Sequence, residues 1–361
     1  MRPLRAALAV LLALAAALGV ALWSAGDRAR HLAVPVLRDP SSPRGAPAAL
    51  EDLAPCRARE RARAGSRVTA LLPASDGALW IGTFDAGLYR LGRAGPPLEV
   101  GGALGRERFA NDLAEHRERV FAATQGGLLV LAPDGRRTSL LVPGTAVTAL
   151  VRSGDRLYAG TARGLLRVAP DGAEVVPVQD PEGRAIRVAA LAASGPLLWI
   201  GTSDGAFSVP VADLEGGGPF TARWRPLVFG DPPADTDVVT ALAPFEGGVL
   251  AGTDDGGLVR LSPEGGVSAV RFADPRANEV NPLAAAPWGA GALFGTQGGG
   301  LLHATFDAGL LKVGRPRGWT APQISALRAR PGGLLAGTAD GRVLEVECDP
   351  GDRAPVAAGG P

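Results

Sequence analysis

One dipeptide, Gly-Thr, recurs through this chain at nearly constant spacing, and it constrains the fold more than any other feature. The threonines of its seven copies are Thr83, Thr124, Thr161, Thr202, Thr253, Thr296 and Thr338, and Ala123 replaces the glycine of the second copy. Successive copies are 41, 37, 41, 51, 43 and 42 residues apart. A period near 42 residues is typical of one four-stranded propeller blade. We therefore predict an all-β chain that forms a seven-bladed β-propeller of four-stranded blades.

Each copy of the dipeptide fits a blade of four strands. Short inner strands of small apolar residues are predicted to start near residues 68, 110, 147, 188, 239, 280 and 324. The second strand is the apolar run that ends in Gly-Thr, and the third strand starts at the next glycine. An outer fourth strand is predicted in six copies, at residues 98–100, 139–142, 175–178, 226–229, 267–272 and 310–313.

The seventh copy ends at residues 343–347 without an outer strand, so another segment must complete it. Residues 32–37 are an unassigned apolar segment, and Pro35 within it suits only an edge strand. We expect this segment to close the ring in preference to the shorter residues 354–357, and residues 50–63 to hold a short helix. Closure would bring the two cysteines, Cys56 and Cys348, together. Outside the cytoplasm they would form a disulfide, with two free thiols as the alternative.

The first 30 residues indicate a targeting segment. Residues 6–23 carry no charge, which suits one membrane-spanning helix or a signal peptide. Trp23 would stand three positions before the candidate cleavage site, where a small residue is needed, so we favour an uncleaved anchor. The predicted organisation is an anchor or signal peptide at 1–30, a closing strand and polar linker at 31–67, the propeller at 68–349, and a flexible tail at 350–361. We place the propeller outside the cytoplasm, with the membrane contacted only by the N-terminal segment.

Charge and residue counts argue against several kinds of chemistry. Residues 68–361 carry 26 basic and 31 acidic side chains, a net charge of −5, which does not favour nucleic-acid binding. The chain has three histidines, and no two share a repeat position, so neither a metal site nor a cofactor is expected. The recurring Asp-Gly pairs match calcium ligands in type, but tight turns require the same pair, and we interpret them as turns.

The second strand also carries a family resemblance. The first and fourth copies read Leu-Trp-Ile-Gly-Thr at residues 79–83 and 198–202, and Gly87-Leu88 opens the next strand of the first copy. This pattern resembles the two-component regulator propeller repeat over residues 68–347. The resemblance implies a propeller of the kind that often forms the extracytoplasmic sensor of membrane-bound signalling proteins. No kinase, cyclase or DNA-binding domain follows here, so the resemblance implies a stand-alone binding module.

Variable residues on a constant framework indicate where function would lie. Loops that enter inner strands and loops that join second to third strands are expected to meet at one end of the central channel. The candidates there are Phe84, Asp85, Asn111, Gln125, Arg163, Arg187, Asp204, Asp237, Asp254, Asp255, Asn278, Asn281, Gln297, Gln323 and Asp340. Unselected loops vary as well, which is the alternative explanation.

We therefore expect a non-catalytic, monomeric propeller that binds a protein, peptide or glycan through this face. One alternative is a structural scaffold in envelope assembly that uses the blade edges. A further alternative is a lyase or hydrolase with carboxylates at the mouth of the channel.

Overall fold

A computed structural model describes most of the chain between residues 50 and 348. The described ranges are 50–53, 55–93, 95–169, 172–176, 178–180, 183–215, 220–221, 223–225, 238–307, 310–317, 319, 321 and 323–348. The predicted anchor at 1–30, the predicted strand at 32–37 and the tail at 350–361 lie outside these ranges. Within them, no helix has the length and apolar character needed to cross a membrane.

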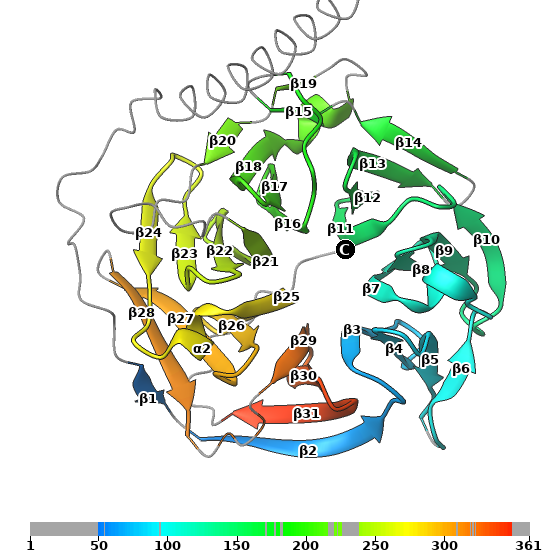
Figure 1. Ribbon diagram of the computed structural model, residues 1–361, viewed down its shortest axis with the longest axis horizontal. Coiled ribbons are helices and arrows are strands. Elements are labelled where there is room, and N and C mark those ends of the chain that lie inside the picture. Colours follow the sequence, from blue (N-terminus) through cyan, green and yellow to red (C-terminus); the bar gives the residue numbers. More distant parts are fainter. Residues whose placement is uncertain are drawn as a thin grey trace, which may run out of the picture. The chain divides into compact units, whose positions relative to one another are not determined.

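Seven four-stranded antiparallel blades stand around one axis, each with its first strand innermost (Figure 1). Blades 1 to 3 consist of β3 (Val68–Pro73), β4 (Leu79–Thr83), β5 (Leu88–Leu91) and β6 (Leu98–Val100); β7 (Ala110–His116), β8 (Arg119–Thr124), β9 (Gly127–Leu131) and β10 (Arg137–Leu141); and β11 (Val147–Ser153), β12 (Arg156–Thr161), β13 (Gly164–Ala169) and β14 (Gly172–Val176). The predicted seven-bladed β-propeller is confirmed.

Blades 4 to 7 continue the ring in chain order. They consist of β16 (Ala190–Ser194), β17 (Leu197–Thr202), β18 (Gly205–Pro210) and β20 (Arg223–Arg225); β21 (Val239–Phe245), β22 (Gly248–Thr253), β23 (Leu258–Leu261) and β24 (Val267–Val270); β25 (Val280–Trp288), β26 (Gly291–Thr296), β27 (Leu301–Asp307) and β28 (Leu310–Pro316); and β29 (Ile324–Arg330), β30 (Gly333–Thr338) and β31 (Arg342–Cys348) with β2 (Cys56–Arg63). The smaller elements are β1 (Glu51–Leu53), the pair β15 (Val178–Gln179) and β19 (Phe220–Thr221), the 3-10 helices η1 (Gly105–Arg108) and η2 (Val211–Glu215), and α2 (Pro275–Asn278).

The outer strand of blade 4 differs from the prediction. It is β20, which pairs Trp224 with Phe207 of β18, whereas the sequence pattern placed it at 226–229. The sequence of β20, Arg-Trp-Arg, is charged, and a search for apolar outer strands does not identify it. An outer strand has one edge in water, so charged residues suit it.

Closure of the ring by an N-terminal strand is confirmed, but another segment than the predicted one supplies it. The fourth strand of blade 7 is β2, antiparallel to β31, so residues 32–37 do not supply it and residues 50–63 are not a helix. The sequence of β2 is Arg-rich and exposed along most of its length, which is why it resembles a polar linker. The expected proximity of the cysteines is confirmed by the register, which pairs Cys56 directly with Cys348. Upstream of β2, strand β1 adds parallel to β28 as a fifth strand of blade 6.

The Gly-Thr dipeptide is explained by packing between blades. A Cβ atom on Gly252 would lie 2.5 Å from Cγ1 of Val280, the first residue of the next inner strand. The same conflict would arise between Gly201 and Val239, at 2.6 Å. Glycine therefore allows a blade to approach the next one in six of the seven copies, and Ala123 fills this position in blade 2. In the first copy, Trp80 lies two residues before the glycine. Its side chain is fully buried, so it packs in the core and has no exposed face for a ligand.

The threonine of the dipeptide fixes the turn that follows. In every blade its Oγ1 atom donates to a main-chain carbonyl at the start of the third strand, for example from Thr83 to Gly87 at 2.7 Å and from Thr202 to Gly205 at 2.9 Å. The equivalent acceptors for the other five threonines are the carbonyls of Gly127, Gly164, Gly257, Gly300 and Arg342. Both residues of the repeated dipeptide are thus structural.

Candidate binding face

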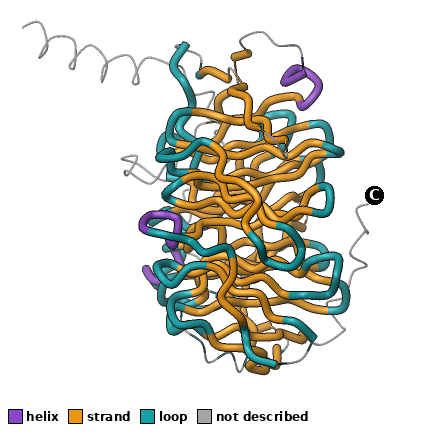
Figure 2. The backbone as a smooth tube through the Cα atoms, turned by 90° about the vertical axis from the view of Figure 1, so that its right-hand side faces the viewer, coloured by secondary structure: helices purple, strands orange, loops and turns teal. Residues whose placement is uncertain are grey.

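Main-chain hydrogen bonds join the two sets of loops that the sequence places at one face. The N–H group of Phe84, in the turn between the second and third strands of blade 1, donates to the carbonyl of Arg67 just before β3, at 2.9 Å. Equivalent bonds link Gln125 to Phe109, Asp254 to Val238, and Gln297 to Glu279, at 2.9–3.1 Å. We call this side of the ring the entry face. Turned on edge, the strands have loops on two opposite sides, and the entry face is one of them (Figure 2).

A second set of hydrogen bonds makes the inner rim rigid. Six inner strands have a register shift after their first residue, and a bulge of this kind redirects a side chain. The redirected side chain donates to a main-chain carbonyl at, or two residues before, the start of the next inner strand at five junctions: Thr69 to Ala110, Asn111 to Val147, Thr148 to Val188, Asn281 to Ile324 and Ser325 to Val68, at 2.6–2.8 Å. These bonds hold the main chain of the entry face in place, and we call this bonded main chain the frame.

Arg67 reaches across this frame. Its Nη2 atom donates to Oδ1 of Asn281 at 2.6 Å, although Arg67 precedes blade 1 and Asn281 belongs to blade 6. Blade 7 stands between these two blades, and a side chain cannot pass around its outside. The guanidinium group therefore lies inside the ring of inner strands. Burial lowers the pKa of the Arg67 guanidinium from its ordinary value.

Arg328 makes a comparable crossing from blade 7. Its guanidinium donates to the carbonyls of Leu71 in blade 1 and Leu113 in blade 2, at 2.9 and 2.7 Å. Asp112 of blade 2 lies near this cation and accepts the N–H groups of Leu113 and Leu150, both at 2.8 Å. Burial raises the pKa of the Asp112 carboxyl, and Arg328 and the two N–H groups oppose this effect. These polar groups are committed to holding blades together.

An aromatic pair lies beside Arg67 on the entry face. Phe84 is 55% exposed, and its ring meets that of Phe109 edge to face, with centroids 5.6 Å apart and planes at 88°. Phe109 immediately precedes the inner strand of blade 2, as Arg67 precedes that of blade 1. The pair presents apolar surface between the first two blades.

The structure exposes most of the predicted candidates. Those with exposed side chains are Phe84, Asp85, Arg163, Arg187, Asp204, Asp254, Asp255, Gln297, Gln323 and Asp340. Two of these carboxylates already have cationic partners, Asp255 with Arg271 at 3.5 Å and Asp340 with Arg342 at 2.9 Å. Asp237 lies outside the described residues.

Four predicted asparagine and glutamine residues are bonded within the protein: Asn111, Gln125, Asn278 and Asn281. Asn281, like Asn278, is buried rather than exposed as predicted. Asn278 is buried, and its amide bonds both the N–H and the carbonyl of Phe272, so it is not part of the exposed face as predicted. Asn111 is half-buried, donating to the carbonyl of Val147 and accepting from Gln125 at 3.3 Å. These side chains vary between repeats because each supports a different local turn or junction.

Sequence reasoning missed Arg67, Phe109, Asp112 and Arg328. A signal for Arg67 was present, because it occupies the position just before the inner strand that Arg187 and Gln323 occupy in blades 4 and 7. Arg328 aligns with small or aliphatic residues of the other inner strands. An arginine at a position that is otherwise apolar was the signal for this residue.

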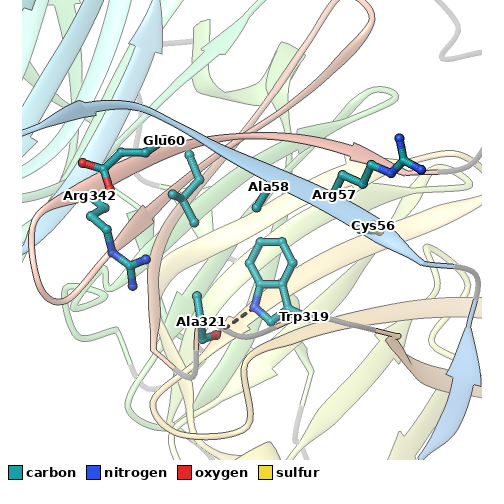
Figure 3. Close-up of a pocket in the computed structure, with 8 residues that line it drawn as sticks. Cys56, Arg57, Ala58, Glu60, Trp319, Ala321 and Arg342 are labelled. Carbon is teal, nitrogen blue, oxygen red and sulfur yellow. Dashed lines mark hydrogen bonds between the residues drawn. The ribbon is translucent and has the colours of Figure 1, made fainter.

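A hollow of about 620 Å³ lies away from the axis, beneath β2 at the outer edge of blade 7 (Figure 3). Trp319 lies against this strand, and its indole N–H donates to the carbonyl of Ala321 at 2.8 Å. Two of the three charged side chains around the hollow have partners nearby, Glu60 with Arg63 and Arg342 with Asp340. We interpret the hollow as part of the closure seam. No three His, Cys, Asp or Glu side chains of the described residues converge as metal ligands would.

One segment of the chain matches a known family. Residues 63–85 match the family described as Two component regulator propeller. This segment covers β3 and β4, so the family resemblance noted in the sequence is confirmed there. No curated protein matches the chain.

Solved structures share the propeller fold. The extracellular domain of a hybrid two component system from B. thetaiotaomicron has a TM-score of 0.62 and 18% identity, covering 80% of this chain and 39% of that chain. A second such domain from B. thetaiotaomicron has a TM-score of 0.58 and 13% identity, covering 82% and 42%. Virginiamycin B lyase from Staphylococcus aureus has a TM-score of 0.64 and 10% identity, covering 81% and 100%. At these identities the similarity establishes the fold alone, and the chain spans about two fifths of the two hybrid-system chains.

Proposed function

We propose that this chain is a non-catalytic β-propeller that binds a protein, peptide or glycan through its entry face. The observation that carries the proposal is the contrast on that face. Equivalent main-chain bonds join the loops in blades 1, 2, 5 and 6. The exposed candidate side chains are aromatic and acidic in blade 1, cationic in blade 3, cationic and acidic in blade 4, and acidic in blade 5. A rigid frame with varied side chains is how repeat proteins build binding surfaces.

The proposal includes an extracytoplasmic location and a sensor-like role in a signalling or envelope system. The support is the match of residues 63–85 and the likeness in fold to extracellular domains of two hybrid two component systems. The uncharged N-terminal segment would hold the protein at the membrane. We propose that the protein acts as a monomer and does not bind nucleic acid.

An oxidising location would also suit the cysteines. Residues directly opposite in antiparallel strands have Cα atoms about 4.5–5.5 Å apart, which lies within the range of disulfides. Cys56 and Cys348 hold such a position, and we propose that they are bonded.

Ligand screening with exchange mapping tests the binding function. Peptide and glycan libraries are screened by thermal shift, and hydrogen exchange locates each hit. The expected result is protection of the turns after Thr83, Thr124 and Thr253, with binding weakened by Phe84→Ala. Arg117→Ala is the control, because Arg117 lies in a turn between first and second strands, on the other side of the ring, and pairs with Asp155 at 2.7 Å. Protection confined to the other side or to outer strands would favour a scaffold that uses blade edges.

The likeness to virginiamycin B lyase raises an enzymatic alternative, which the positions of the described histidines do not favour. A solved structure of that lyase with quinupristin carries an inactivating replacement of a histidine. Here His116 ends β7 on the side opposite the entry face, and His303 lies in β27, the third strand of blade 6. Turnover of a cyclic depsipeptide, lost on replacement of an entry-face residue, would contradict the non-catalytic proposal.

A further inference from the structure

Arg67 is a half-buried cation on the entry face that makes no ion pair with the described residues, unlike the exposed Arg163 and Arg187, which water can solvate. Arg67 is half-buried inside the ring, where Nη2 donates to the neutral amide oxygen of Asn281. Among the described residues Arg67 makes no ion pair. The acids of the adjoining loops, Asp85 in blade 1 and Glu279 in blade 6, do not pair with it. Its Nε and Nη1 groups bond no described residue.

This arrangement is unfavourable without a counter-charge. Moving a charge away from water costs free energy unless an opposite charge or hydrogen bonds compensate, and one amide oxygen compensates only in part. A guanidinium presents a planar fork of donors that matches the two oxygens of a carboxylate. An incoming carboxylate would accept hydrogen bonds from Nε and Nη1 of Arg67, which bond no described residue.

Arg67 is also held in place before any ligand arrives. Its carbonyl accepts the N–H of Phe84 at 2.9 Å, which fixes its main chain. The amide of Asn281 is fixed in turn, because its nitrogen donates to the carbonyl of Ile324 at 2.6 Å. Binding therefore requires little ordering of the guanidinium, which favours affinity.

The surroundings of Arg67 favour a peptide over a sugar as the source of the carboxylate. Phe84 and Phe109 offer apolar surface in an edge-to-face pair, which is not a flat platform for a sugar ring. The amides of Asn111 and Asn281 are already bonded to protein groups at both ends. These two amides therefore offer no remaining partner to a hydroxyl group, whereas an acidic and apolar peptide would meet the guanidinium of Arg67 and the aromatic pair.

We propose that Arg67 receives the carboxylate of a peptide ligand, while the pair formed by Phe84 and Phe109 packs against an apolar side chain of the same peptide. This inference rests on the proposed function, since it assigns a ligand class to the entry face. It also predicts how affinity depends on salt. An ion pair formed at the mouth of the ring is screened as ionic strength rises.

Fluorescence polarisation with paired peptides tests the inference. The probes are labelled peptides in a neutral Gly-Ser frame, each with one Glu and one Phe or Leu at separations of one to six residues, and a matched series with Gln for Glu. The acidic series is expected to bind wild-type protein about 10- to 100-fold more tightly than the Gln series. Arg67→Gln should abolish that difference, and Arg67→Lys should retain part of it. Arg117→Gln, which removes an exposed cation from the other side, is the control.

The outcomes separate this inference from the proposed function. Equal binding of the acidic and Gln peptides would overturn the inference, and if exchange protection still mapped to the entry face, the proposed function would stand. Binding of a labelled oligomer of uronic acid, with no binding of the acidic peptides, would overturn the peptide as occupant. Absence of binding by any acidic peptide would also overturn it. The comparison of peptide series uses wild-type protein, so it remains decisive even where Arg67→Gln fails to fold.

Discussion

The Nη2 atom of Arg328 donates a hydrogen bond to the carbonyl oxygen of Leu113 at 2.7 Å, although 215 positions separate the two residues. Nε of the same guanidinium donates to the carbonyl of Leu71 at 2.9 Å. One side chain of the last blade thus bonds the main chains of the first two blades. These contacts lie where the end of the chain meets its beginning, so Arg328 strengthens the ring at its seam.

Replacing Arg328 with Met is expected to lower the free energy of unfolding by about 2–4 kcal/mol. The change leaves two main-chain carbonyls without a charged donor and Asp112 without its nearby cation. Urea unfolding at pH 7 measures the effect. Arg330→Met is the control, because Arg330 lies two residues later and makes an ion pair with Glu345 at 3.4 Å that is worth less than about 1 kcal/mol. Equal losses in the two variants would show that Arg328 does not clamp the seam.

The sequence predicted the repeated part of the fold because packing and turn formation impose nearly the same requirements from blade to blade. Glycine at 252 permits the approach of Val280, and Thr83 and its counterparts fix the next turn, so these residues recur and reveal the blade count. The outer strands lack such a requirement. β2 and β20 are the outermost strands of their sheets, where Arg-rich sequences are tolerated, and the apolar pattern predicted residues 32–37 and 226–229 instead.

The candidate site was predictable only in outline. Alignment of repeats identified the loops of the entry face, and the structure joins them by main-chain bonds such as that of Gln125 with Phe109. The reach of Arg67 to Asn281 depends on which blades face each other across the axis, and spacing along the chain does not contain that information. The burial of Asn278 depends likewise on a local bond to Phe272.

Reduction of the proposed bond between Cys56 and Cys348 is expected to destabilise the ring. The bond would close a loop of nearly three hundred residues, for which the chain-entropy relation gives about 6 kcal/mol. Thermal unfolding with and without reductant measures the effect, and non-reducing gels show the shift in mobility. The double variant Cys56→Ser with Cys348→Ser should unfold at the lower temperature under both conditions. A wild-type protein indifferent to reductant would contradict the bond.

The inner-strand hydrogen bonds predict opposite effects at two equivalent positions. Thr148 donates to the carbonyl of Val188 at 2.8 Å, and Thr148→Val should cost about 1–2 kcal/mol by leaving that carbonyl without its donor. Ala189 holds the same position in the next blade and has no side-chain donor, so Ala189→Thr should add up to about 1 kcal/mol. Chemical denaturation of both variants tests the pair. A loss of stability in Ala189→Thr would mean that the junction of blades 4 and 5 is too close for the added side chain.

His116 predicts a loss of stability in mild acid. The side chain is buried beside Phe121, and burial lowers its pKa, as do the charges of Arg117 and Arg152, while Asp155 opposes them. Because the folded pKa is below the unfolded value of about 6.5, the unfolded chain binds more protons in this range. The contribution of His116 is therefore complete above pH 6.5 and is lost as the pH falls toward its folded pKa. Unfolding free energies at pH 7, 6 and 5 should fall more steeply for the wild type than for His116→Gln. If the unfolding free energies of the two proteins fall in parallel with pH, the pKa of His116 is the same in the folded and unfolded states. The acid sensitivity would then belong to other groups.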